Sequence, residues 1–394
     1  MTKIPSQKNA RGAGRRASSI ISFAVAPALL LALAGWRGSA LREARHAGAH
    51  GGAGAAELAG GAGAAGAPPM VEFVNVALGG FRGLVADLLW MRVGRLQEER
   101  RFVELAQLSD WITKLEPGLS EVWEFHSWNM AYNISVIMTR PEDRWLWVRN
   151  GIELLRDSAL RINPNDATLQ RALGWIFQHK LAMDSDRFSP WYRARWVVEM
   201  DAYLGENGAI PGDDDFLAAE LENNFSMEPA TMREIEARFG SIDWRLPSAQ
   251  ALYWAWRGLR TAAASKILPC RRMIYTAISD MAYRHGILDG DLSADDYIFA
   301  ARPNTALIES GADFFEETMS RHEFNGIRFA YVGFLRNAIV ILARDGEAAR
   351  SRAAYERMKT FFRDKITRPL PPYEQALHAP DEFYQALMFE AGYK

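Results

Sequence analysis

The sequence is poor in cysteine and nearly balanced in charge. It has 394 residues and a single cysteine, Cys270, which excludes an intrachain disulfide and any cysteine-rich zinc or iron–sulfur site. The formal net charge is −2 at pH 7, so the charge balance gives no reason to expect a nucleic acid as partner. Apolar residues make up 49% of the chain, which is enough to bury a substantial core.

Catalytic and cofactor motifs are missing as well. The sequence has no GxSxG, HExxH or GxxxxGKS/T pattern, and its histidines beyond residue 100 are scattered without metal-ligand spacing. A GxGxxG match at 61–66 lies in Gly/Ala-rich sequence with no strand before it, so it indicates no dinucleotide site. We therefore expect no catalysis, no metal and no small-molecule cofactor. The alternative is an enzyme whose site is assembled from distant carboxylates in residues 205–300.

One acidic loop has some of the features of a cation site. Residues Asp289–Asp296 resemble the second half of an EF-hand calcium loop, but the first two ligand positions fall on His285 and Ile287, which do not suit calcium. We interpret the loop as a joint between two helices, with Ser293 capping the second one.

The beginning of the chain has the pattern of an export signal. Residues 1–16 are a basic tail without acidic residues, and residues 17–36 are an apolar segment long enough for a transmembrane helix. Because the basic flank stays in the cytoplasm, the rest of the chain is expected outside it. Two interpretations stay open: an uncleaved signal anchor, or a signal peptide cleaved at a small-x-small site at 32–34 or 38–40. Residues 37–70 are rich in Gly and Ala and predict a flexible linker.

From Val71 onward the sequence predicts helices. Apolar residues recur at three- and four-residue spacing, and Gly, Pro, Asn and Asp fall between the segments. No segment alternates apolar and polar residues, so we expect an all-α fold without a sheet. In the second half, the expected helices are 248–259, 271–285, 329–342 and 347–362, and Pro229 is expected to begin a short one.

Two turns in the first half carry the same motif residues. Pro117 is followed six residues later by Trp123, and Pro164 is followed by Leu173-Gly174 and then Phe177. The two prolines lie 47 residues apart, with the excess length placed in a loop around Pro141.

These positions resemble the tetratricopeptide (TPR) repeat, a helical hairpin of about 34 residues. The resemblance covers residues 86–180 and, less closely, 325–364. It implies an α-solenoid with TPR-like repeats in 71–205, an insertion in 206–247 and divergent helical repeats in 248–394. The segment 239–247 also resembles a block of membrane-anchored bacterial TPR proteins, a resemblance that implies no activity.

In TPR proteins the first helix of each repeat lines a concave binding groove. Carrying the groove positions over to this sequence gives Glu121, Glu124, Trp128, Tyr132, Thr168, Arg171, Trp175, Gln178 and His179. Trp128 and Trp175 occupy the same position in neighbouring repeats, so they would form an aromatic floor for a peptide or a partner helix. The alternative is that both tryptophans pack between helices, which would leave them fully buried.

The resemblance therefore implies a scaffold that binds a protein or peptide in its groove. Through residues 17–36 it would be a single-pass protein of the bacterial inner membrane, with its N-terminus in the cytoplasm and its bulk in the periplasm. Cleavage of that segment would give a secreted form instead. The competing function is a structural subunit of a cell-envelope assembly, for which we expect a large exposed apolar patch on the convex face or at the C-terminal end.

Overall fold

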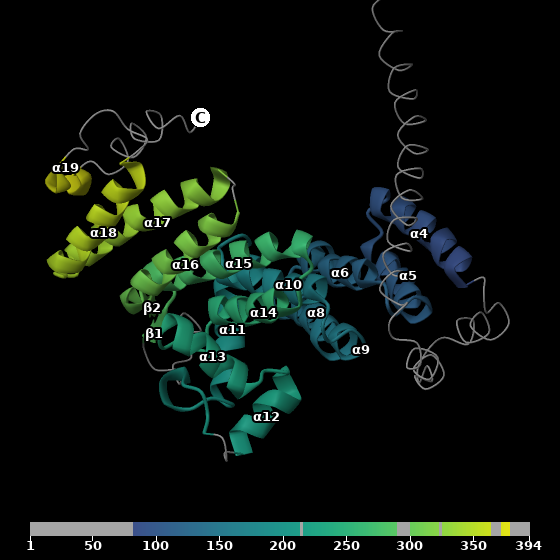
Figure 1. The fold of residues 1–394 in the computed structure, drawn as a ribbon. Helices are drawn as coiled ribbons and strands as arrows, with labels where there is room; N and C mark the ends of the chain where they lie inside the picture. Colours follow the sequence, from purple (N-terminus) through teal and green to yellow (C-terminus); the bar gives the residue numbers. More distant parts are fainter. Residues whose placement is uncertain (1–81, 213–215, 290–299, 323–324, 364–371, 379–394) are drawn as a thin grey trace, which may run out of the picture. The chain divides into compact units, whose positions relative to one another are not determined.

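The computed structural model describes residues 82–212, 216–289, 300–322, 325–363 and 372–378 (Figure 1). The chain divides into two units, Met1–Gly66 and Ala67–Lys394, and every described residue belongs to the second unit. The predicted tail 1–16, membrane segment 17–36 and linker 37–70 lie outside the described residues.

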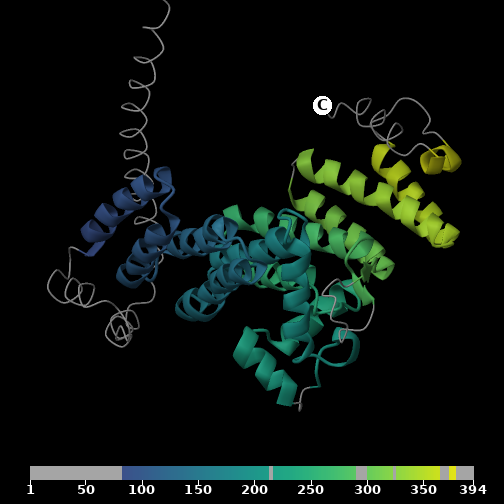
Figure 2. The same cartoon turned by 180° about the vertical axis from the view of Figure 1, so that it is seen from behind.

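The first half of the described chain is helical throughout. Its helices are α4 (Arg82–Glu98), α5 (Phe102–Leu115), α6 (Ser120–Trp128), α7 (Ser135–Ile137), α8 (Pro141–Glu153), α9 (Leu160–Ile162), α10 (Ala167–Trp175) and α11 (Ser189–Asp201). Three π-helical segments continue these helices without a break: Asn129–Ile134 joins α6 to α7, Leu154–Ala159 joins α8 to α9, and Ile176–Ala182 extends α10. Helix α6 packs against α8 and against α10. Figures 1 and 2 show this part of the chain from opposite sides.

The second half is also mainly helical. Its helices are α12 (Phe216–Phe225), α13 (Pro229–Phe239), α14 (Pro247–Thr261), α15 (Ala264–Tyr283), α16 (Ile308–Arg321), α17 (Asn325–Arg344), α18 (Ala348–Phe362) and α19 (Tyr373–His378), with 3-10 turns at Glu206–Gly208 and Thr305–Leu307. The prediction of a mostly helical fold is confirmed. The residues 206–247, predicted as an insertion, contain α12 and α13 and the segment that leads into α14.

Proline and glycine set several of these boundaries. The helices α8, α11, α13 and α14 each carry a proline in the first turn, where its fixed φ suits a helix and its missing N–H costs nothing. The start of α13 at Pro229 is the predicted one. Helix α15, in contrast, begins seven residues before the expected Arg271, because Pro269 lies inside the helix rather than ahead of it. Gly346, with φ of +81°, forms the left-handed turn between α17 and α18.

The expectation of no sheet is wrong. Strands β1 (Ile287–Asp289) and β2 (Ala300–Arg302) pair in antiparallel register, with Leu288 opposite Ala301. Each strand has only three residues, which is too short for an alternating pattern to stand out in the sequence. The predicted cation loop lies between these strands, and its residues after Asp289 are outside the described ones.

The buried apolar side chains form two clusters. The larger one runs from Trp123 in α6 to Ala376 in α19, and the smaller one fills the space between α4, α5 and α6. Among the described helices, only α17 is long and apolar enough to cross a membrane, and half of its apolar window (50%) is buried in the protein. It packs against α16 and α18, which is the environment of a core helix.

Candidate functional site

The candidate site lies on two helices that begin in the same way, α6 and α10. Trp123 donates from Nε1 to the carbonyl oxygen of Pro117 (2.9 Å), and Gln170 donates from Nε2 to that of Pro164 (2.8 Å). Each bond ties a side chain of the first turn to a carbonyl six residues before it. Gln250 makes the same bond to Trp244 at the start of α14 (2.8 Å). Three helix starts are therefore fixed by one type of contact.

The first turns of α6 and α10 are also joined to each other. The Oδ1 atom of Asp166 accepts hydrogen bonds from the backbone N–H groups of Thr168 (2.7 Å) and Leu169 (3.1 Å), which caps α10. The other carboxylate oxygen accepts a hydrogen bond from Ser120 at the start of α6. In the same region, Asn163 donates from Nδ2 to the carbonyl oxygen of Pro117 (2.9 Å). These two bonds, each between residues 46 positions apart, hold the starts of the two helices together.

Above these turns, equivalent side chains of α6 and α10 meet in pairs. Arg171 forms an ion pair with Glu124 (2.8 Å), 47 residues earlier in the chain. Two helical turns further on, the rings of Tyr132 and His179 lie 5.6 Å apart. Trp128 stacks on Tyr132 at 5.9 Å between centroids, and Trp175 stacks on His179 at 5.0 Å. These four rings form a continuous group, which we call the aromatic surface.

The two tryptophans of the aromatic surface remain open to solvent. Trp128 and Trp175 are each 39% exposed, so neither side chain is fully buried between helices. Tyr132 and His179 are half-buried beneath them. Burial lowers the pKa of His179, so this ring is neutral at pH 7 and stacks without carrying a charge.

Two residues assigned to the groove from the sequence do not reach the open face. Gln178 is buried and donates from Nε2 to the carbonyl oxygen of Met273 (3.0 Å), and Thr168 is buried in the first turn of α10. Gln178 lies in the π-helical segment 176–182, where each turn holds more residues than an α-helical turn. A residue three positions after Trp175 is therefore carried toward the core, whereas His179 returns to the open face. Glu121 is exposed and has no contact with the aromatic surface among the described contacts.

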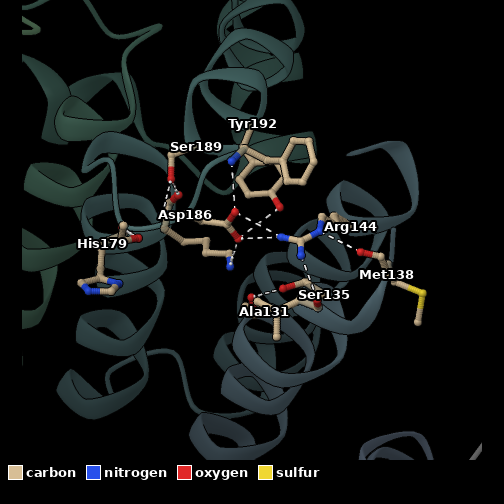
Figure 3. Close-up of polar contacts among 12 residues, drawn as sticks. Ala131, Ser135, Met138, Arg144, His179, Asp186, Ser189 and Tyr192 are labelled. Carbon is tan, nitrogen blue, oxygen red and sulfur yellow. Dashed lines mark hydrogen bonds and ion pairs between the residues drawn. The ribbon is translucent and has the colours of Figure 1, made fainter. Parts of the chain in front are cut away.

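A buried ion cluster lies beside Tyr132 and His179 of the aromatic surface. Figure 3 shows the contacts within this cluster. The carboxylate of Asp186 accepts a hydrogen bond from Lys180 Nζ (2.7 Å) and lies 3.1 Å from Arg144 Nη1. Arg144 also donates to the carbonyl oxygens of Met138 (2.9 Å) and Val136 (2.8 Å) at the end of α7. The Lys180 ammonium lies over the ring of Tyr132, 5.3 Å from its centroid, and so connects the cluster to the aromatic surface.

The charges of this cluster are set by burial and by one another. Burial lowers the pKa of Lys180, against the opposite influence of Asp186. Burial alone would raise the pKa of Asp186, but hydrogen bonds from Lys180 and from the backbone N–H of Phe188 outweigh it and lower the pKa. Burial also raises the pKa of Tyr192, which packs beside the cluster, to about 12. The sequence did not point to Arg144, Lys180 or Asp186, because they come from three separate segments.

The described residues show no cluster typical of a metal centre. Within ranges 82–212, 216–289 and the later described segments, no three His, Cys, Asp or Glu side chains gather as metal ligands would. In the region 205–300, Asp243 pairs with Arg245 (2.8 Å), and Asp280 accepts a hydrogen bond from Ser248 (2.5 Å). Glu236 accepts from Trp244 Nε1 (3.0 Å). Each of these three carboxylates is thus engaged by an internal donor.

Comparison with known proteins adds no relative. No protein-family model matches the chain, and neither the curated proteins nor the solved structures contain a significant match.

Proposed function

We propose that this chain is a non-catalytic scaffold that binds a protein partner on the aromatic surface. The observation that carries the proposal is the pair Trp128 and Trp175, which occupy equivalent places on α6 and α10 and are both 39% exposed. Large aromatic side chains are costly to leave in water and are enriched among the residues that dominate protein interfaces. Here they are held side by side through Tyr132 and His179, which makes one surface of two separate side chains.

The partner that suits this surface is an apolar segment lying across both helices. The charged pair Glu124 and Arg171 neutralises itself at one end of the surface, and Asp186 engages Lys180 at the other. The rings between them are uncharged, because burial keeps His179 neutral, so a strongly charged partner gains little along the rings. An extended peptide or an amphipathic helix with an aliphatic or aromatic face matches the rings better.

We further propose that the helices are TPR-like repeats. The equivalent contacts at the starts of α6, α10 and α14, and the pairs 46 or 47 residues apart, support a repeated structural unit. Residues 17–36 would tether the chain to the bacterial inner membrane and place this scaffold in the periplasm, as the sequence pattern predicts.

Site-specific photo-crosslinking tests the binding surface directly. A photoreactive phenylalanine analogue at position 128 or 175, in the full chain in its native membrane, should form a crosslinked adduct with one partner protein. The same analogue at Phe216, an apolar residue that is 74% exposed on α12, is the control for chance collisions. The adduct should also weaken when the other tryptophan is changed to Ala. Equal crosslinking at all three positions would show that the aromatic surface is not the binding interface.

A structural subunit of an envelope assembly is the second candidate. Helix α4 carries an exposed apolar stripe of Leu84, Leu88 and Met91, which are 58%, 54% and 51% exposed. Their spacing puts them on one face of the helix, where a neighbouring subunit would bury them. Changing all three to Ser should release the chain from a large complex on native gels if this function is the right one, while Trp128→Ala/Trp175→Ala should not.

A further inference from the structure

A second surface feature, distant in sequence from the aromatic surface, is a basic cavity between three elements. It has a volume of about 360 Å³ and lies between the end of α9, the turn after α12 and the middle of α14. Its wall contains three arginines, Arg156, Arg161 and Arg257, but only one carboxylate, Asp157. Asp157 offsets the charge of Arg156. Glu228, which lies 3.4 Å from Arg257 Nη2, offsets that of Arg257. Among the described residues, one uncompensated positive charge remains, that of Arg161.

Two of these arginines are held in fixed positions. Arg156 makes a two-point contact with Asp157 through Nε (2.6 Å) and Nη2 (2.8 Å), and its guanidinium carbon lies 5.2 Å from the ring centroid of Phe225. Arg257 lies over Trp254, 5.6 Å from its ring centroid, and donates from Nη1 to the carbonyl oxygen of Ser226 (3.3 Å). Stacking on aromatic rings restricts both guanidinium groups before any ligand arrives.

The third arginine is free to bind a ligand. Within the described part of the chain, Arg161 makes no hydrogen bond or ion pair and is exposed at the rim of the cavity. Asn223, also exposed at the rim, makes no hydrogen bond among the described residues either. Among the described residues, the charge of Arg161 is thus not offset by an internal carboxylate.

The wall also has an apolar part that limits the kind of anion. Leu160 and the ring of Trp254 line the cavity on the side of α9 and α14. A guanidinium group binds phosphate through two parallel hydrogen bonds, and several guanidinium groups around one cavity favour a doubly charged anion over a singly charged one. A cavity of about 360 Å³ is larger than a phosphate ion, so it leaves room for an organic group against Leu160 and Trp254.

We propose that this cavity binds a phosphomonoester, with Arg161 and Arg257 contacting the phosphate and the organic group lying against Trp254. The phosphomonoester is either a small free molecule or a phosphorylated side chain of a peptide, because both present the same dianion. The site is separate from the aromatic surface and does not depend on partner binding there.

Phosphorus NMR on the full chain in detergent tests the assignment. The probes are phenyl phosphate and a tetrapeptide containing phosphoserine, and line broadening of the phosphorus signal measures binding. We expect at least one probe to bind saturably. The probe that binds more tightly shows whether the ligand is a small free phosphomonoester or a phosphorylated side chain of a peptide. Binding should weaken with added salt, because the contact is between charges near the surface.

Three variants make the experiment specific. Arg161→Ala should weaken the preferred probe at least about tenfold, and Arg161→Glu should abolish binding, since the second change reverses a charge. Arg161 has no internal partner, so neither change is expected to unfold the protein, and circular dichroism checks this. Arg92→Ala removes an exposed arginine on α4 and should leave binding unchanged. The proposal fails if no probe binds saturably, if phenol competes as well as phenyl phosphate, or if Arg161→Ala and Arg92→Ala behave alike.

Discussion

His126 should make the first helices of the array sensitive to mild acid. The residue is buried on α6, only 2% exposed, next to Asp110 and Lys114 of α5. Burial lowers the pKa of His126 from the ordinary 6.5 to about 4, and Asp110 opposes this only in part. In the unfolded chain the histidine binds its proton near pH 6.5. Between these two values the unfolded state therefore holds more protons than the folded one.

The sign and size of the effect follow from that difference. The unfolded state is stabilised as the pH falls from 6.5 toward 4, so the free energy of unfolding decreases over this range. The two pKa values correspond to a loss of about 3 kcal/mol, of which the greater part should be seen by pH 4.5. Above pH 7 the histidine is neutral in both states and contributes no pH dependence.

His126→Leu isolates this contribution. The variant removes the titrating ring and also the buried Nδ1 atom, which has no hydrogen-bond partner among the described residues, so we expect it to fold at pH 7.5. Urea unfolding followed by circular dichroism at pH 7.5 and pH 4.5 gives the four free energies needed. The wild type should lose more stability than the variant, by about 2 to 3 kcal/mol. Equal losses in both proteins would show that His126 is protonated as easily in the folded state as in the unfolded one.

Other predictions concern single contacts. Asp186→Ala leaves Arg144 and Lys180 buried without their common anion and should cost about 3 to 5 kcal/mol, whereas Asp184→Ala, at a carboxylate that is 66% exposed, should cost less than about 1 kcal/mol in urea unfolding. Gly174→Ala should lower the melting temperature, because a Cβ there would lie 2.7 Å from Met273 Sδ. Gly94→Ala, where nothing lies within 4 Å of the added Cβ, should raise the melting temperature, since it adds about 0.5 to 1 kcal/mol to the free energy of unfolding. Arg171→Glu puts a second carboxylate beside Glu124 and should lower the free energy of unfolding by up to about 1 kcal/mol. The double variant with Glu124→Arg should recover most of this loss; no recovery would mean that the ion pair contributes nothing to stability.

The sequence was most informative where the segment after Pro117 could be compared with the segment after Pro164. The motif residues Pro117, Trp123 and Pro164 gave the spacing that put Trp128 and Trp175 at equivalent places, and both side chains are on one open face. The same counting put Glu124 and Arg171 among the groove positions, although it did not predict their ion pair. Helix periodicity and turn residues also predicted α14, α17 and α18 closely.

The failures have local physical causes. Gln178 was misplaced because a π-helical segment changes which residues face outward, and nothing in apolar periodicity marks a π turn. The ion cluster was missed because its members meet only in the folded chain, with Arg144 and Asp186 separated by 42 residues. The strands β1 and β2 were missed because a three-residue strand is held by its partner and by neighbouring side chains, such as Asp243, whose carboxylate accepts from the N–H of Leu288 (3.0 Å).

The features around the aromatic surface bear on how it would bind. Caps and side-chain bonds fix the starts of α6 and α10, and the Asp186 cluster fixes the segments beyond the rings. Trp128 and Trp175 stack on neighbours that are themselves half-buried, so their side chains have little rotational freedom left to lose. The conformational entropy lost on binding is then mainly that of the partner. We therefore expect Trp128→Ala and Trp175→Ala to act on the dissociation rate, by removing packed contacts, while the association rate changes little.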